Sequence, residues 1–327
     1  GVYQALIEAR IPFEMVHDRR MDAESLAPFK TLVLPNIAAL SEGQCAQLRD
    51  FVARGGNIVA TFETSLYDEV GHHHDTFGLR DLFGVDFDDA PAAGLQGPLK
   101  NTYLNLEHGT PLASELLAGL EAAQRMIYGA YRVHVRPHDN LSPQPLTLVP
   151  PYPDLPMEEV YPRAPRTAIP GIICREGLAT TRDQDTRAGR VVYVPWDLAR
   201  IFWEVLNVDH GKLLANAVRW ATGGPQPVEV EGPGVLDVTL WRLPQALTVH
   251  LVNLTNPMLM RGPIRELLPI GPQTVRVQLP SDVAPKRLRL LKADTEADFD
   301  VKNGVLTVNV PEIIDHEVIA VDFDEDL

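Results

Sequence analysis

The chain opens with apolar residues spaced three and four positions apart, at Val2, Leu6, Ile7 and Ile11. This spacing predicts one face of a helix, and residues 12–16 follow it as a short predicted strand. A sheet with helices on both faces normally starts with a strand that feeds its first helix. We therefore expect the first strand of this domain to lie upstream of the sequence given.

Two apolar, β-branched runs predict buried strands of a parallel sheet, at residues 30–35 and 57–62. Between them Ser41 begins a predicted helix, which Gly55-Gly56 ends. The predicted inner face of that helix consists of Cys45, Leu48, Phe51 and Val52. A second, shorter helix is predicted over residues 77–83.

The pattern weakens between residues 86 and 190. Strands are predicted over residues 103–106, 128–135, 169–174 and 190–194, and a helix over residues 111–120. Nine prolines between residues 143 and 170 exclude a regular element there. We expect that segment to be a wrapping or contact-making loop.

A helical pattern ends at residues 213–220, and Gly223-Gly224-Pro225 breaks it. Beyond Pro227 the chain alternates apolar and polar positions in segments that turn residues separate, which predicts an antiparallel β-sandwich. The sequence thus predicts an α/β domain over residues 1–224 and a β-sandwich over residues 225–327.

The composition of the 327 residues, 45% apolar and 22% charged, is ordinary for a soluble globular protein. No run of about 18 apolar residues predicts a membrane span. The formal net charge of −15 disfavours contact with nucleic acid or an anionic membrane. Two cysteines, Cys45 and Cys174, exclude a disulfide framework, and no cofactor motif is present. The absence of a signal peptide leaves the compartment open, with the cytoplasm favoured.

The strongest candidate site follows the strand at residues 57–62, because ligands of open α/β sheets collect beyond the carboxyl ends of the strands. Glu63 with Asp68 or Glu69 would provide the paired carboxylates of a glycosidase. The alternative is structural, with Glu63 and Asp68 accepting hydrogen bonds from backbone amides at the strand end.

Three consecutive histidines, His72, His73 and His74, suggest a zinc or nickel site. Consecutive loop residues rarely face one ion, so a solvated polar loop is the simpler interpretation. Tyr67 and Trp196 are candidates for stacking on a sugar face, although tryptophan beside a long helix is more often part of the core.

Several stretches resemble a known family. KTLVLPNIAALSEGQCAQLRDFVARGGNIVATFETSLYDE, FGLRDLFGV and GRVVYVPWDLARIFWEVLNVDHGKLLANAVRWA resemble the middle, trimerisation domain of family 42 glycoside hydrolases of the β-galactosidase type. That domain is similar in fold to class I glutamine amidotransferases, so the resemblance implies a flavodoxin-like sheet. ALTVHLVNLTNPMLMRGPIRELLPIGPQTVRVQLP resembles the small β domain that follows it.

The resemblance places hydrolysis in an N-terminal (β/α)8 barrel outside these residues. It also puts Glu63 where an amidotransferase has its nucleophilic cysteine, and residues 193–197 supply no partner histidine. Cys45 lies on the predicted inner face of a helix and cannot replace that thiol.

Three hypotheses follow. The first is a non-catalytic, oligomerising portion of a glycoside hydrolase that forms a homo-oligomer, a dimer or trimer, with the proline-rich segment and residues 63–74 at a subunit contact or against the barrel. The second is a hydrolase in its own right that uses Glu63. The third is a carbohydrate-binding module that uses Trp196, Trp203 or Trp241.

Overall fold

The structure, a computed structural model, describes residues 1–90, 102–139, 141–150, 156, 158–159, 167–179, 189–256, 263–280 and 283–325. Contacts between residues divide the chain into two compact units. The first comprises residues 1–2 and 16–223, and the second comprises residues 3–15 and 224–327. Among the described residues, no helix combines the length and the apolar character that crossing a membrane requires.

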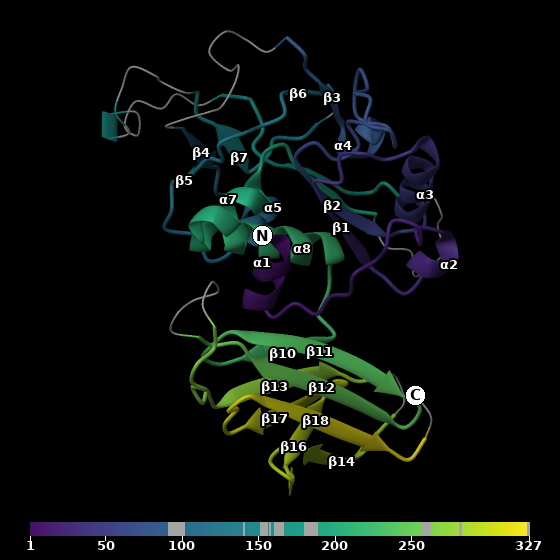
Figure 1. Cartoon of the computed structure of the whole chain (residues 1–327), viewed down its shortest axis with the longest axis vertical. Helices are drawn as coiled ribbons and strands as arrows, with labels where there is room; N and C mark the ends of the chain where they lie inside the picture. Colours follow the sequence, from purple (N-terminus) through teal and green to yellow (C-terminus); the bar gives the residue numbers. More distant parts are fainter. Residues whose placement is uncertain are drawn as a thin grey trace. The chain divides into compact units, whose positions relative to one another are not determined.

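A four-stranded sheet forms the centre of the first unit (Figure 1). Its strands, in spatial order, are β1 (Thr31–Pro35), β2 (Asn57–Thr61), β9 (Val191–Val194) and β8 (Ile173–Arg175). The first three run parallel, whereas β8 runs antiparallel to β9. Every residue of β2 is buried, as expected for a strand with a neighbour on each side and cover on both faces. The strands predicted at residues 30–35, 57–62 and 190–194 are confirmed.

Helix α3 (Glu42–Ala53) begins at the predicted residue because its first turn is capped from both directions. The Gln44 amide donates to Ser41 Oγ (3.2 Å), and the Ser41 amide donates to Gln44 Oε1 (3.0 Å). At the other end, Gly55 takes φ 91° and the Gly56 amide donates to the Phe51 carbonyl (2.9 Å). Its four predicted inner residues are all buried.

The other helices of the first unit are α2 (Ala23–Leu26), α4 (Arg80–Phe83), α5 (Pro111–Leu116), α7 (Leu198–Val205) and α8 (Val208–Thr222). Helix α4 is shorter than the prediction of residues 77–83, and Gly84 closes it in the left-handed conformation.

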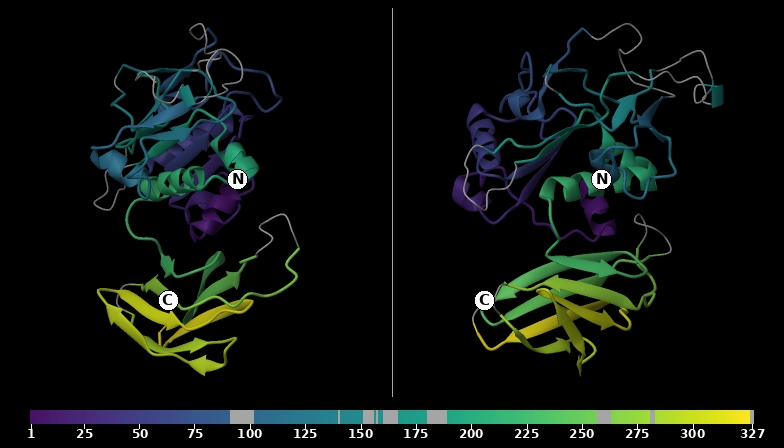
Figure 2. Two further views of the ribbon diagram at one scale, coloured as in Figure 1. Left: turned by 90° about the vertical axis from the view of Figure 1, so that its left-hand side faces the viewer. Right: turned by 180° about the vertical axis from the view of Figure 1, so that it is seen from behind.

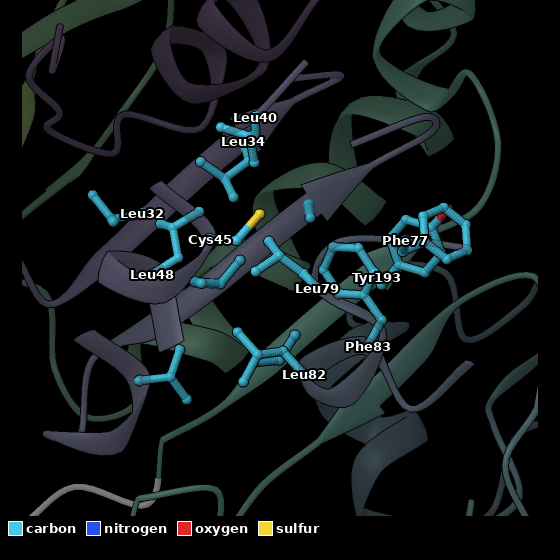
Figure 3. Packing of buried hydrophobic residues seen from close by; sticks show 14 of the residues in the cluster. Leu32, Leu34, Leu40, Cys45, Leu48, Phe77, Leu79, Leu82, Phe83 and Tyr193 are labelled. Carbon is cyan, nitrogen blue, oxygen red and sulfur yellow. The ribbon is translucent and has the colours of Figure 1, made fainter. Parts of the chain in front are cut away.

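The core of the first unit lies between α3, α4 and the sheet (Figure 3). Cys45 and Leu48 of α3 face Leu32 and Leu34 of β1 in this view. Beside them the ring of Tyr193 stacks on Phe83, with centroids 4.3 Å apart and planes 4° from parallel. Tyr193 thus joins β9 to α4 through buried aromatic contact.

Two small sheets complete the first unit: β3 (Val85–Phe87) with β6 (Val135–Pro137), and β5 (Arg125–Ile127), β4 (Tyr103–Leu106) and β7 (Leu146–Leu148) in that order. The strand predicted at residues 128–135 is wrong, because most of this range connects β5 to β6 and forms only one isolated bridge, Arg132 to Trp196. Strand β7 lies within the proline-rich segment, which therefore does contain a regular element. Residues 151–155, 157 and 160–166 of that segment lie outside the described residues.

The second unit has two antiparallel sheets. One consists of β10 (Val228–Glu231), β13 (Gln273–Gln278), β17 (Val305–Val310) and β16 (Phe299–Lys302). The other consists of β11 (Leu236–Leu243), β12 (Ala246–Asn253), β18 (His316–Phe323), β14 (Pro285–Leu290) and β15 (Thr295–Glu296). The strands of both sheets can be followed in Figure 2. Alternate residues of both sheets meet in one hydrophobic core, to which β13 contributes Val275 and β12 contributes Val249. The fold is consistent with the predicted α/β class followed by a β-sandwich.

Helix α1 (Val2–Glu8) confirms the predicted N-terminal helix. The strand predicted at residues 12–16 is wrong: no strand forms there, and Met15 is 85% exposed. A short apolar run with no neighbouring strand to pair with does not form a strand.

Arg10 ties the segment of residues 3–15 to the strands of the second unit. Its guanidinium donates to the carbonyls of Val230 (3.1 Å), Gly232 (2.7 Å), Pro233 (3.1 Å) and Gly234 (2.8 Å), and to Gln273 Oε1 (3.0 Å). Burial lowers the pKa of Arg10, but an arginine stays charged. One cation therefore satisfies the carbonyls of the turn between β10 and β11. Residues 3–15 group with this unit, whereas the sequence assigns them to the first domain.

We predict that Arg10→Met destabilises the second unit by about 2 kcal/mol, because hydrogen bonds to a charged donor contribute about 1.5–3 kcal/mol and the turn carbonyls lose theirs. Amide hydrogen exchange of β10 and β13 measures the effect, with Arg19→Met, at an exposed position, as the control. Unchanged exchange in Arg10→Met would show that the guanidinium contributes nothing to this turn.

Candidate functional site

The carboxyl edge of the sheet is shaped by a sharp turn at the end of β2. Phe62 takes a left-handed conformation (φ 55°), and so does Asn36 at the end of β1 (φ 53°). Asn36 joins the two strand ends, because its amide donates to Thr61 Oγ1 (3.0 Å) and its Oδ1 accepts from the Glu63 amide (3.1 Å). The Tyr193 hydroxyl donates to the Phe62 carbonyl (2.6 Å), which adds β9 to the same junction.

Glu63 follows this turn directly, and its side chain is half-buried. The negative charge of its carboxylate contributes to raising the pKa of two phenols, those of Tyr67 and Tyr193. Burial first, and then the negative charge of Glu63, raise the pKa of Tyr67. Burial raises the pKa of Tyr193 well above its ordinary value, and Glu63 adds to that shift. Neither phenol ionises near neutral pH, so Glu63 has no acidic tyrosine beside it to act as a proton donor.

Asp68 has a structural role. Its Oδ1 accepts hydrogen bonds from the amides of Val70 (3.0 Å) and His72 (2.8 Å), and its Oδ2 lies 3.1 Å from His72 Nδ1. These bonds, chiefly the one from the His72 amide, lower the pKa of Asp68. The carboxylate closes the turn at residues 68–72, which agrees with the structural alternative for this residue. It remains an anion and cannot supply the proton that a general acid must donate near neutral pH.

The three histidines diverge. His72 has a side chain that is 82% exposed, next to Asp68. The His73 ring packs edge-on between Tyr67 (centroids 5.1 Å) and Phe87 (5.0 Å). The His74 amide donates to the Leu66 carbonyl (2.9 Å), in the small hairpin that also pairs Tyr67 with His73. Within the described ranges, no group of three or more His, Cys, Asp or Glu side chains is placed to hold a metal ion.

Trp196, a predicted sugar contact, is fully buried. Its indole Nε1 donates to the Gly171 carbonyl (2.7 Å), and its ring stacks on Tyr128 with centroids 4.9 Å apart. No face of the ring is open to a ligand, so the expectation of a sugar contact at Trp196 is corrected to a core role. Asp197 beside it is also buried, accepts from the Tyr131 amide (3.1 Å), and has its pKa raised by that burial.

Two basic residues at this edge, an arginine and a histidine, have no role in the sequence-based prediction. Arg132 and His134 lie on the segment that runs antiparallel to residues 195–197, where the Val133 amide donates to the Pro195 carbonyl (2.8 Å). Among the residues that the structure describes, none makes a hydrogen bond to the buried Nε and Nη1 of Arg132 or to the buried Nδ1 of His134. Burial, and then the charge of Arg132, lower the pKa of His134.

The positive charge of Arg132 lowers the pKa of Tyr193, whereas the negative charge of Glu63, at the end of β2, raises it. The edge therefore brings a carboxylate, two phenols and a guanidinium close together. Residues 132 and 134 stand two apart in an extended segment and so point to one face. This alternation is the one feature of the sequence that could have placed Arg132 and His134 on the same face. Their burial and their lack of hydrogen-bond partners can be seen only in the folded chain.

Neither thiol belongs to this edge. Cys45 lies in the core between α3 and β1, and burial raises its pKa (Figure 3). Cys174 on β8 is buried as well, and its pKa is raised for the same reason. A buried neutral thiol is a poor nucleophile. The carboxyl edge of the sheet therefore presents Glu63 without either thiol of the chain beside it.

Comparison with known proteins identifies part of the chain. The sequence profile of the family described as "Beta-galactosidase trimerisation domain" matches residues 2–109. The matched residues include β1, α3 and β2 of the first unit but not β9 or any strand of the second unit. The resemblance noted in the sequence is thereby confirmed over these residues.

Curated relatives agree over limited stretches. β-Galactosidase BgaB of Geobacillus sp. (strain Y412MC61) is 27% identical over 148 residues, which cover 39% of this chain and 21% of BgaB. β-Galactosidase BbgII of Bifidobacterium bifidum is 33% identical over 87 residues, which cover 25% of this chain and 12% of BbgII. The matched part of the chain thus spans about a fifth or less of the length of these relatives.

Solved structures share the fold of almost the whole chain. α-L-Fucosidase isoenzyme 2 from Paenibacillus thiaminolyticus has a TM-score of 0.70 at 18% identity, over 98% of this chain and 44% of that one. A β-galactosidase from Bacillus circulans sp. alkalophilus has a TM-score of 0.60 at 13% identity, over 98% of this chain and 36% of that one. At these identities the likeness concerns the fold alone.

We predict that Asp68→Ala speeds hydrogen exchange at the amides of Val70 and His72, because both lose their acceptor, while Asp68→Asn has a smaller effect because its Oδ1 still accepts. The pKa of Asp68 is lowered by folding, so its contribution to the turn is present above the unfolded pKa of about 4 and is lost as pH falls through the folded value. Equal exchange in wild type and Asp68→Ala would contradict the assigned role.

Proposed function

We propose that this chain is the oligomerising, substrate-site-shaping portion of a β-galactosidase-like glycoside hydrolase of carbohydrate metabolism. The match of residues 2–109 to the trimerisation domain carries this proposal. The geometry of the carboxyl edge supports the non-catalytic part of it, because Asp68 is committed to a turn and both cysteines are buried away from Glu63.

The finer fold assignment belongs to the same proposal. Three parallel strands in the order β1, β2, β9 and a left-handed residue at the end of the central strand favour a flavodoxin-like, amidotransferase-like sheet. In that fold the turn after β2 is where a nucleophile would stand. Here Glu63 occupies the turn, so the edge is best interpreted as a former active site retained as a structural loop.

The site-shaping role rests on Arg132 and His134. Buried donors without an acceptor are rare in folded proteins, and each one costs about 1–3 kcal/mol if it stays unpaired. A carboxylate or a sugar hydroxyl from outside this chain would satisfy them. An acceptor on the catalytic barrel, on another subunit or on a bound carbohydrate fits the position at the carboxyl edge.

The hydrolase alternative, with Glu63 and either Asp68 or Glu69 as the catalytic pair, has less support. A glycosidase needs one carboxyl group free to give a proton and another free to act as base or nucleophile. Both Asp68 oxygens accept hydrogen bonds in the turn, which leaves Glu69 as the only partner from that set.

We predict that the chain as given does not hydrolyse a nitrophenyl β-galactoside above background and that Glu63→Gln changes nothing in this assay. Far-UV circular dichroism establishes that both proteins are folded. Hydrolysis that Glu63→Gln abolishes in a folded protein would refute the non-catalytic assignment and establish the alternative.

A further inference from the structure

We infer that the outer face of the five-stranded sheet in the second unit binds a sugar, with the indole of Trp241 as the platform on which one pyranose ring stacks. The inference takes the class of sugar, a β-galactoside, from the proposed function, and everything else from the second unit. Six side chains define the site, which we call the Trp241 face: Trp241, Thr248, Arg287, Arg289, Ala320 and Asp322.

Trp241 is the most exposed of the three tryptophans that the sequence offers as sugar contacts. It is 60% exposed, whereas Trp203 is 40% exposed and Trp196 is fully buried. Trp241 also lies on a firmly held element, because β11 pairs with β12 along its whole length, from Leu236 to Leu243. A platform on a paired strand loses little backbone entropy when a ligand covers it.

The Trp241 face points away from the hydrophobic core. Val249 on β12 and Ile319 on β18 both belong to that core. Successive side chains of a strand point to opposite sides of its sheet, so Thr248 and Ala320, the preceding and following residues, face outward. Trp241 pairs directly with Thr248 and therefore stands on the same outward side.

One row of this face crosses four strands of the sheet, β11, β12, β18 and β14 (Figure 1). Trp241 pairs with Thr248, Thr248 pairs with Ala320, and Ala320 pairs with Arg289. Neighbouring strands lie about 4.8 Å apart, so about 14 Å separate the two ends of the row. The two residues between those ends are small. The row thus has an indole at one end, a guanidinium at the other and a low strip between them that is wide enough for a sugar ring.

The end of the strip opposite the indole carries the polar groups that sugar hydroxyls need. Asp322 Oδ2 lies 3.3 Å from Arg287 Nη2 and 3.3 Å from Arg289 Nη2. All three side chains are between 26% and 46% exposed, so a ligand can reach them. A carboxylate accepts hydrogen bonds and a guanidinium donates them, so together they match neighbouring hydroxyls, each of which can donate and accept.

This mixture of groups identifies the occupant as a neutral sugar. A pyranose presents a C–H face to an aromatic ring and a rim of hydroxyls to polar side chains, and sites for such ligands combine apolar walls with a few placed polar groups. An anion is disfavoured, because both arginines already share Asp322 and the chain carries a net charge of −15. A protein partner needs a broader apolar centre than Trp241 and Leu243, its exposed neighbour on β11.

The β-galactoside follows from the shape of its ring together with the proposed function. The ring of a β-galactoside has one axial hydroxyl, which leaves the opposite side as a continuous surface of C–H groups. That side suits the indole of Trp241, and the hydroxyls at the ring's edge then face Asp322 and Arg289. Lactose is the probe of choice, because its galactose ring carries this face and its glucose ring serves as a comparison within the same molecule.

Saturation-transfer NMR with lactose and the full chain tests the site. We expect millimolar binding, with the strongest transfer to the C–H face of the galactose ring. Trp241→Ala should weaken binding at least about 10-fold, because the stacking platform is lost, while Trp241→Phe should retain part of it. Trp203→Ala removes another exposed indole and is the matched control, which should bind lactose like wild type. Thermal melting shows that each variant is folded.

The outcomes separate this site from the proposed function. No transfer to lactose from folded wild type, or equal transfer from wild type and Trp241→Ala, would overturn the site. Transfer confined to the glucose ring would contradict the assigned sugar. Sedimentation equilibrium of the same samples tests the proposed function independently: a monomeric chain that binds lactose through Trp241 would refute the oligomerising role and support the site. A reduced mass of Trp241→Ala without lactose binding by wild type would assign this face to a protein contact instead.

Discussion

The turn at the end of the buried strand β2 determines what the carboxyl edge of the sheet can do. Phe62 must leave the sheet in a left-handed conformation, which costs about 1 kcal/mol or more for a residue other than glycine. Four of the hydrogen bonds that hold this turn are those of the Phe62 amide to the Val194 carbonyl, Tyr193 Oη to the Phe62 carbonyl, the Asn36 amide to Thr61 Oγ1, and the Glu63 amide to Asn36 Oδ1. Tyr193 is fixed in turn by its stacking on Phe83, so the turn is anchored in the core.

This anchoring gives the edge the geometry of a reaction site without the chemistry of one. Asp68 closes a turn, the His73 ring is packed between Tyr67 and Phe87, and Trp196 is buried. At this edge, the buried Nε and Nη1 of Arg132 and the buried Nδ1 of His134 have no hydrogen-bond partner among the described residues. The Arg132 guanidinium and the His134 imidazole on one side and the Glu63 carboxylate on the other suit a surface that meets an outside group better than a site that performs a reaction on its own.

Local patterns predicted much of this architecture. A buried β-branched run sufficed for β1 and β2, and the capping residues Ser41 and Gln44 marked the start of α3. Elements that depend on distant partners were missed. Residues 12–16 have strand-like composition but no strand to pair with, and Arg132 lies in a connection whose shape depends on contact with residues 195–197. The burial of Trp196 likewise depends on Tyr128 and His210, far away in the sequence.

The proposed function requires that copies of this chain associate. Sedimentation equilibrium of the wild-type chain over a wide concentration range tests this most directly. The account predicts a limiting mass of three times the chain mass of 36.2 kDa, in keeping with the trimerisation domain. A mass that stays at 36.2 kDa at every concentration would contradict it.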